Sequence, residues 1–323
     1  MIIRELRRML HAIFTQLLRA SDTMLLAQIA SAGNITVVRD GTFETLGVLR
    51  RPEQGMLVFL EHAKFLPSVR RMSEATCVIT TPAIARAAVG AAAVGAKGLA
   101  TSDTPRWAFH RIHAHLALKT AFYWTDFKTE IHSSARIHPR AVVAKRNVRI
   151  GPGTVVEANA TIDERCIIGA NVTIRSGAVL GSAGFQTIRT EGRVEEMVHA
   201  GGVAVDDGAH ILANAVVAPA IFRSFTRIGA QARVGNCACI SHGVQLGARS
   251  HVGHGSVVCG YAAIGSDVWV GPGATLTNNI TVGDGANVTI GAVVIRDVKP
   301  GQRVAGNFAV AHRALLKHVA TLR

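Results

Sequence analysis

Residues 228–294 read IGAQAR VGNCAC ISHGVQ LGARSH VGHGSV VCGYAA IGSDVW VGPGAT LTNNIT VGDGAN VTIGAV V. Every sixth residue of this stretch is Ile, Leu or Val, and glycine often follows it directly. A period of six is neither the helical period of about 3.6 nor the alternation of a simple strand. It is typical of a β-helix, in which each hexad forms a short strand and a turn, and three hexads form one triangular coil of about 18 residues.

The same period continues toward the N-terminus and predicts about eight stacked coils, with neighbouring strands about 4.8 Å apart. Two slips in phase occur, one before Ile150 and one before Ile228. Residues 181–202 hold no hexad phase, so we interpret them as a loop excursion, which is often functional on a repetitive scaffold. The aliphatic residues that carry the period upstream of Ile228 are Ile131, Ile137, Val143, Ile150, Val156, Ile162, Ile168, Ile174, Leu180, Val205, Ile211 and Val217.

Residues 1–125 lack this period and are interpreted as an α/β domain. We expect residues 126–306 to form the β-helix and residues 307–323 to form a short basic helix, with a link between the first two domains over residues 121–130. Three histidines of the α/β domain, His110, His113 and His115, are expected at the surface of a helix. The strands predicted in this domain cover residues 43–49, 56–60 and 77–80, and the helices cover residues 84–94 and 107–120.

Apolar residues at positions 3, 6, 10, 13, 14 and 17 recur at helical spacing, with arginines between them. This pattern favours a helix packed on its own domain, and a membrane-surface helix stays open as the alternative. Arginines at positions 4, 7 and 8 interrupt any apolar core of a signal peptide, and no apolar run reaches the roughly 18 residues of a membrane span. We therefore expect a cytoplasmic protein.

The chain has 323 residues, 49% of them hydrophobic, and its 35 Lys and Arg against 21 Asp and Glu give a net charge of +14. There is no compact basic tract with interleaved aromatic residues, so nucleic acid is disfavoured. An acidic carrier protein, phosphate groups or an anionic membrane surface fit the charge better, and a role in solubility alone stays open. The five cysteines lack metal-ligand spacing, so we expect small buried side chains in a reducing cytoplasm and no bound metal.

Two segments together resemble a known family. Residues 58–65 read VFLEHAKF in the α/β domain, and residues 239–247 read CISHGVQLG within the hexads. The pair is similar to UDP-3-O-acylglucosamine N-acyltransferase of lipid A biosynthesis, over about residues 45–306. The resemblance implies a left-handed parallel β-helix and a homotrimer with active sites between subunits. It also implies transfer of an acyl chain from acyl carrier protein, or acyl-CoA, to the amino group of a UDP-linked amino sugar. The resemblance implies no permanently bound cofactor. It implies that the protein is located in the cytoplasm or at the inner face of the inner membrane.

The resemblance assigns the catalytic base to His242. A sugar ammonium must lose a proton before it attacks a thioester, and an imidazole suits this step. Gly260 follows one coil later, so we expect it to stack directly beside His242. The resemblance implies that the Gly260 N–H holds the developing oxyanion. A surface histidine and an ordinary turn glycine are the structural alternatives.

Substrate-binding residues are implied in both domains. Phe59 and Phe65 match the family's aromatic pair around uracil, with ordinary core phenylalanines as the alternative, and Lys64 beside them is expected near a phosphate. Asn236 and Phe185 match positions at which the family contacts its substrate.

One position departs from the family pattern. Asn279 stands where the family has a second histidine, and asparagine cannot take up a proton. His254 lies two hexads after His242, on a different face of its coil, so it is expected to reach the site only from a neighbouring subunit. The identity of the substrate is therefore left open.

Four alternatives to this function stay open. A sugar acetyltransferase that uses acetyl-CoA would share the fold and the base, and residues 304–309, VAGNFA, resemble the end of such enzymes. A β-helix zinc hydratase needs about three convergent histidines, whereas a non-catalytic scaffold needs none. Asn279 also favours a degenerate, inactive paralogue.

Overall fold

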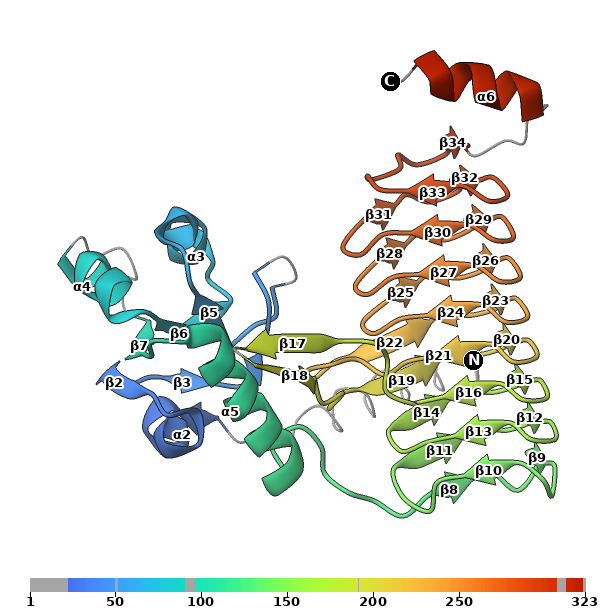
Figure 1. Cartoon of the computed structure of the whole chain (residues 1–323). Coiled ribbons are helices and arrows are strands. Elements are labelled where there is room, and N and C mark those ends of the chain that lie inside the picture. The colour runs from blue at the N-terminus through green and yellow to red at the C-terminus, as the bar shows by residue number, and fades with distance from the viewer. Residues whose placement is uncertain (1–22, 50–51, 91–96, 191, 307–311, 322–323) are drawn as a thin grey trace.

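The computed structural model describes residues 23–49, 52–90, 97–190, 192–306 and 312–321 (Figure 1). Over these residues a long triangular β-helix stands beside a smaller α/β unit, and helix α6 (His312–Thr321) lies beyond the last coil. The predicted fold class, a left-handed parallel β-helix with an N-terminal α/β unit and a short C-terminal helix, is confirmed. The helix predicted near residues 3–17 and the motif residues 307–309 lie outside the described residues.

Three parallel sheets of eight, eight and nine strands form the faces of the β-helix, in agreement with the predicted number of coils. In a regular coil each strand pairs with the strand 18 residues away, as Val258 does with Ile240 and with Leu276. These three side chains are fully buried and stack along the axis, whereas Val257 faces outward and is 36% exposed. The inward aliphatic column, not any local strand propensity, is therefore what holds these two-residue strands in register.

The strands of each face follow one another along the axis in chain order. The first sheet contains β10 (Val142–Val143), β13 (Thr161–Ile162), β16 (Val179–Leu180), β21 (Val216–Val217), β24 (Cys239–Ile240), β27 (Val257–Val258), β30 (Thr275–Leu276) and β33 (Val293–Val294). The second contains β8 (Glu130–Ile131), β11 (Val148–Ile150), β14 (Cys166–Ile168), β19 (Gly202–Val205), β22 (Phe225–Ile228), β25 (Gln245–Leu246), β28 (Ala263–Ile264) and β31 (Thr281–Val282). The third contains β9 (Arg136–Ile137), β12 (Val155–Val156), β15 (Thr173–Ile174), β20 (His210–Ile211), β23 (Arg233–Val234), β26 (His251–Val252), β29 (Trp269–Val270), β32 (Asn287–Val288) and β34 (Arg303–Val304).

Two insertions interrupt the coils on the side that faces the α/β unit. Leu180 pairs with Val217 rather than with a residue 18 positions on, because residues 181–202 leave the stack. The predicted excursion is confirmed, but it is an ordered antiparallel hairpin of β17 (Thr187–Thr190) and β18 (Arg193–Glu196) rather than a plain loop. A second insertion, residues 219–224, accounts for the slip before Ile228, which pairs with Val205.

The α/β unit has a five-stranded sheet, parallel except at one edge, with the spatial order β2, β7, β6, β5, β4. The predicted strands near residues 43, 56 and 77 and the helices near residues 84 and 107 are confirmed in place, with shifted ends. The division into domains at residues 125 and 306 stays a prediction. The elements are β1 (Met24–Leu25), α2 (Leu26–Gly33), β2 (Thr36–Arg39), β3 (Thr42–Phe43), β4 (Thr45–Leu46), β5 (Met56–Leu60), η1 (Ala63–Phe65), α3 (Leu66–Arg71), β6 (Ala75–Thr80), α4 (Pro82–Gly90), β7 (Gly98–Thr101) and α5 (Pro105–Lys119).

The two insertions tie the β-helix to α5. Phe222 of the second insertion packs edge-on against Phe109 of α5, with ring centroids 5.8 Å apart. The His113 Nε2 atom lies 2.7 Å from the Val198 carbonyl oxygen, and His110 lies 3.6 Å from the Glu195 carboxylate. The irregular parts of the repeat therefore position the β-helix against the α/β unit.

Two predictions about which side chains are exposed and which are buried were wrong. His110 and His113 are 3% and 0% exposed, because the β17–β18 hairpin covers their face of α5, and only His115 is exposed. Among the cysteines, Cys77 and Cys166 are buried as expected, but Cys237 is exposed and Cys239 and Cys259 are half-buried. The last three lie at turns or on outward positions of the coils, where a side chain cannot reach the axis.

Candidate functional site

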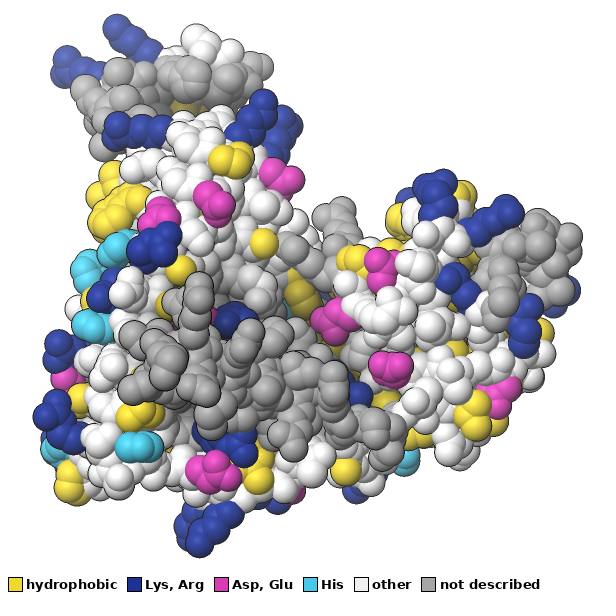
Figure 2. All heavy atoms as spheres, turned by 180° about the vertical axis from the view of Figure 1, so that it is seen from behind, with side chains coloured by type: hydrophobic (Ala, Val, Ile, Leu, Met, Phe, Trp, Pro, Cys, Tyr) yellow, Lys and Arg dark blue, Asp and Glu magenta, His cyan; other side chains and the backbone are white. Residues whose placement is uncertain are grey.

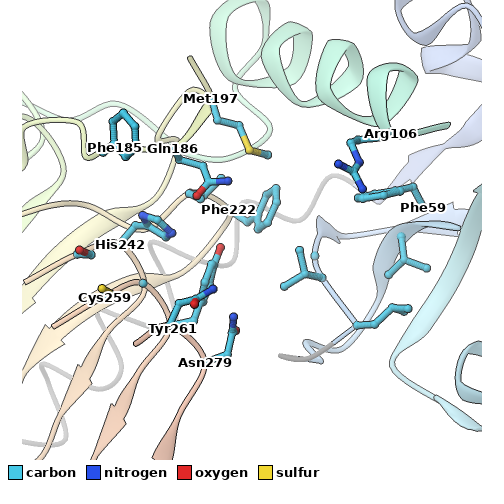
Figure 3. Close-up of a pocket in the computed structure, with 18 of the residues that line it drawn as sticks. Phe59, Arg106, Phe185, Gln186, Met197, Phe222, His242, Cys259, Tyr261 and Asn279 are labelled. Atoms are coloured by element: carbon cyan, nitrogen blue, oxygen red, sulfur yellow. The ribbon is translucent and has the colours of Figure 1, made fainter. Parts of the chain in front are cut away.

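A cavity of about 780 Å³ lies between the β-helix and the α/β unit. Its walls come from three sources: β5 and α5 of the α/β unit, the two insertions, and the turns that follow β24, β27 and β30 (Figure 3). Most of the lining is apolar. The cavity brings together six of the predicted site residues, namely Phe59, Phe65, Phe185, His242, Gly260 and Asn279.

His242 follows β24 and projects into this cavity, although only 7% of its surface is exposed. Its ring meets the Tyr261 ring edge-on, with centroids 5.2 Å apart. Burial, followed by the nearby His199, lowers the pKa of His242 to about 4. The imidazole is therefore neutral at physiological pH and has a lone pair available to accept a proton.

Gly260 stacks directly beside His242, as the 18-residue spacing predicted. A Cβ atom built on Gly260 would lie 2.3 Å from His242 Nε2, so any side chain at this position would collide with the ring. The coils are also joined here by the Tyr261 N–H, which donates to the His242 carbonyl oxygen at 2.9 Å. The Gly260 N–H forms no hydrogen bond to any of the described residues.

The opposite wall carries the aromatic residues of the α/β unit. Phe59 lies on β5 and Phe65 ends the short helix η1. Phe59 packs on Phe109 with ring centroids 5.1 Å apart, and Arg106 of α5 lies 5.7 Å from the Phe59 ring centre. Arg106 also pairs with Glu61 at 2.9 Å, and both side chains line the cavity.

The first insertion covers the cavity between these walls. Phe185 and Gln186 precede β17 and Met197 follows β18. Figure 3 shows Phe185 and Gln186 near His242, and Met197 farther away, near Phe222. Phe185 is 93% exposed, so its ring is available to a ligand. Asn279 lies on the β-helix wall next to Tyr261, and its backbone N–H donates to the Gly260 carbonyl oxygen.

Three predicted residues do not line this cavity. The Lys64 ammonium lies 5.1 Å from the Phe65 ring centre. Asn236 and His254 stack on each other at a different corner of the β-helix, where the Asn236 N–H donates to His254 Nδ1 at 2.8 Å. Their roles stay predictions.

Several residues that line the cavity, and one that lies behind its wall, were missed in the sequence. Arg106 and Phe222 carry no pattern that marks them, since a helix and an insertion bring them to the site. Tyr261 is marked by its spacing, because it follows Gly260 and stands one coil and one residue after His242. His199, which faces His242 with ring centroids 5.5 Å apart, belongs to the excursion that carries no period.

Neither a metal site nor a membrane span is found in the described parts of the chain. Residues 23–306, outside the short gaps, and α6 contain no cluster of three His, Cys, Asp or Glu side chains suited to a metal ion. No helix among the described residues is long and apolar enough to cross a bilayer. On the face seen in Figure 2, Lys and Arg side chains are distributed over both parts of the molecule rather than gathered in one patch.

Comparisons with known proteins give one family match and several relatives. Residues 147–182 match the bacterial transferase hexapeptide family (six repeats). UDP-3-O-acylglucosamine N-acyltransferase of Pseudomonas entomophila is 28% identical over 264 residues, which are 69% of this chain and 69% of the relative. The enzyme of the same name from Paracidovorax citrulli is 28% identical over 57% of this chain, and this alignment spans 54% of that relative.

Among solved structures, a UDP-N-acetylglucosamine acyltransferase from Campylobacter jejuni is similar with a TM-score of 0.45 and 24% identity, over 55% of this chain and 72% of that chain. The Arabidopsis enzyme has a TM-score of 0.42 and 18% identity, over 58% of this chain and 76% of that chain. The resemblance predicted from the sequence is thus confirmed by the curated relatives: this chain is a hexapeptide β-helix protein similar in sequence to UDP-3-O-acylglucosamine N-acyltransferases.

Proposed function

We propose that this protein is an acyltransferase that moves an acyl chain from a thioester donor to the amino group of a UDP-linked amino sugar, as in lipid A biosynthesis. The curated relatives support this reaction class. The observation that carries the proposal is one cavity in which a neutral imidazole, His242, and an available N–H, that of Gly260, share a wall. The opposite wall offers an aromatic face and a cation, Phe59 and Arg106.

In the proposed reaction, His242 Nε2 takes a proton from the sugar ammonium and frees its nitrogen lone pair. The amine then attacks the thioester carbonyl carbon, and the Gly260 N–H stabilises the oxyanion that forms. When this intermediate collapses, the C–S bond breaks and the thiolate takes the proton back from His242. The new amide nitrogen still carries one extra proton, which it gives to the neutral His242, and His242 releases this proton to water. The products are an amide and a free thiol. A bound diphosphate would raise the pKa of His242 by its negative charge, which strengthens the base when substrate is present.

The nucleotide end of the substrate fits the α/β wall. Phe59 and Phe65 offer ring faces for uracil, in the manner that the resemblance implied. Arg106 is a better candidate for the diphosphate than Lys64, because Arg106 lines the cavity whereas Lys64 does not. Phe185 and Asn279 are proposed to contact the sugar or the acyl chain.

The donor and the assembly are further parts of the proposal. Arg313 and Lys317 are exposed on α6 and offer charge to an acidic carrier protein or a membrane surface. The sheet that runs from β10 to β33 has exposed outward valines at several of its coils, namely Val142, Val216, Val257 and Val293. This stripe supports a homotrimer, in which Asn236 and His254 of one subunit would approach the site of the next.

Acyl transfer followed by mass spectrometry tests the function. The assay offers UDP-3-O-acylglucosamine and other UDP-amino sugars as acceptors, with acyl carrier protein thioesters and acetyl-CoA as donors. Long-chain amide that is lost in His242→Ala, but kept in the exposed control His115→Ala, supports the proposal. Transfer from acetyl-CoA alone indicates a sugar acetyltransferase instead, and no transfer from any pair indicates an inactive paralogue or an unfamiliar acceptor.

A further inference from the structure

A second histidine stands behind the proposed base. His199 lies on the return limb of the first insertion, after β18, and is 9% exposed. Its ring meets the His242 ring edge-on, with centroids 5.5 Å apart and an angle of 70° between the planes. No sequence pattern marks this residue, and the mechanism above does not use it.

The hydrogen-bond partner of His199 fixes its tautomer. Its Nδ1 atom lies 3.1 Å from the Met197 carbonyl oxygen. A carbonyl oxygen only accepts hydrogen bonds, so Nδ1 carries the proton. Burial lowers the pKa of His199, so the ring is neutral and its Nε2 atom presents a lone pair.

His242 also has a buried ring nitrogen without a hydrogen-bond partner among the described residues. Its Nδ1 atom and the His199 Nε2 atom are both buried, and neither forms a hydrogen bond to any of the described residues. Both lie close to Gly184: a Cβ atom built there would be 3.4 Å from His199 Nε2 and 3.9 Å from His242 Nδ1, with the Ala218 Cβ atom at 3.0 Å. Buried polar atoms are rarely unpaired, and ordered water usually satisfies them.

We propose that His199 is a positioning residue for His242, acting through one ordered water held at Gly184. The water accepts the His242 Nδ1–H and donates to His199 Nε2. This arrangement places the lone pair of His242 on Nε2, the atom that faces Gly260 and the cavity. It also stabilises the imidazolium that forms during the reaction, a task that a carboxylate often performs for a catalytic histidine. The role in the reaction rests on the proposed function, whereas the tautomer does not.

Two substitutions at position 199 separate this role from simple packing. His199→Asn keeps an amide N–H for the Met197 carbonyl and loses the acceptor that faces His242. His199→Gln places an amide oxygen near the position of Nε2 and so restores the acceptor. A third variant, Gly184→Ala, places a methyl group at the proposed water site. The backbone of Gly184 does not require glycine because its φ is not positive, but the methyl group also approaches the Ala218 Cβ atom to 3.0 Å, so its folding is checked by urea unfolding.

The primary readout is the tautomer of His242, measured by nitrogen-15 NMR on histidine-labelled protein and assigned by the signal lost in His242→Gln. We expect the Nδ1–H tautomer in the wild type and His199→Gln, and a mixture of tautomers in His199→Asn and Gly184→Ala. A general base contributes roughly 10²–10⁴-fold, so we expect His199→Asn to lower kcat about 10- to 100-fold, with KM for the sugar nucleotide changed less than about twofold.

If His199→Asn keeps the wild-type tautomer of His242 and the wild-type kcat, His199 is not a positioning residue. If Gly184→Ala keeps the wild-type tautomer, no water at Gly184 links the two histidines. If the tautomers are as expected but the wild type transfers no acyl group from any donor, the positioning inference is supported and the proposed function is wrong. The two failures are thus distinguishable.

Discussion

Replacing Gly260 by alanine is the sharpest perturbation of the proposed site. The new methyl group would lie 2.3 Å from His242 Nε2, whereas real Cβ atoms essentially never come closer than 3.0 Å. The backbone at Gly260 has no positive φ, so the alanine itself is not strained. The imidazole must therefore shift by about 0.7 Å or leave its rotamer, while the coil stays intact.

The expected loss of activity follows from this displacement. A misplacement of about 1 Å costs on the order of 10²-fold in rate, so Gly260→Ala should lower kcat at least about 100-fold. Overpacking costs about 1–3 kcal/mol, so urea unfolding should show a chain that is weakened but still cooperative. Binding of UDP should change less than about twofold, because the proposed nucleotide contacts lie on the opposite wall.

Two controls decide whether the methyl group acts through the imidazole. In Gly306→Ala the new methyl group meets none of the described residues within 4 Å, so this variant should leave kcat unchanged. The double variant with His242→Ala should be no less active than His242→Ala alone, because the methyl group then has no ring to displace. A folded Gly260→Ala protein with a kcat within about threefold of the wild type would show that the position of this imidazole does not control the rate.

Three further predictions concern acid stability, the core and the nucleotide. Burial lowers the pKa of His113 to about 4, below the ordinary 6.5 of the unfolded chain, so its stabilisation is complete above pH 6.5 and falls as the pH drops toward 4. The free energy of unfolding should fall by about 3 kcal/mol over this pH range. Urea unfolding should therefore depend less on pH in His113→Phe than in the wild type, and an equal dependence in both proteins would contradict this prediction. Val258→Ala should lower the free energy of unfolding by about 2–3 kcal/mol and the exposed Val293→Ala by less than about 0.5, so equal losses would be inconsistent with an axial core. Arg106→Ala should raise KM for the UDP-sugar about tenfold and leave kcat unchanged, because one charge-assisted hydrogen bond to the substrate is lost. An unaltered KM in steady-state kinetics would show that Arg106 is not part of the nucleotide site.

The β-helix could be predicted because a period of six is a local property of the chain. Each inward residue, such as Val258 or Ile240, must be aliphatic because the axis excludes water, and the turn between them needs small residues. The same spacing predicts that Gly260 lies beside His242, one coil away. Parts of the site that lie on the repeat were therefore accessible from the sequence.

Parts of the site that lie off the repeat were not accessible. His113 contacts the carbonyl of Val198, 85 positions away, and no local pattern in α5 signals that the β17–β18 hairpin covers it. His199 reaches His242 from that same excursion. Arg106 faces the cavity because α5 packs beside β5, which is a tertiary contact. Long-range contacts of this kind leave no periodic signal in the residues that make them.

The most direct test of the proposed chemistry is amide formation by the wild type beside His242→Ala, with a UDP-amino sugar and an acyl thioester. We expect an amide product whose rate of formation falls at least about 100-fold in His242→Ala, since the proposed general base is then absent. Equal rates in the two proteins, or no amide from the wild type with any donor, would contradict this mechanism.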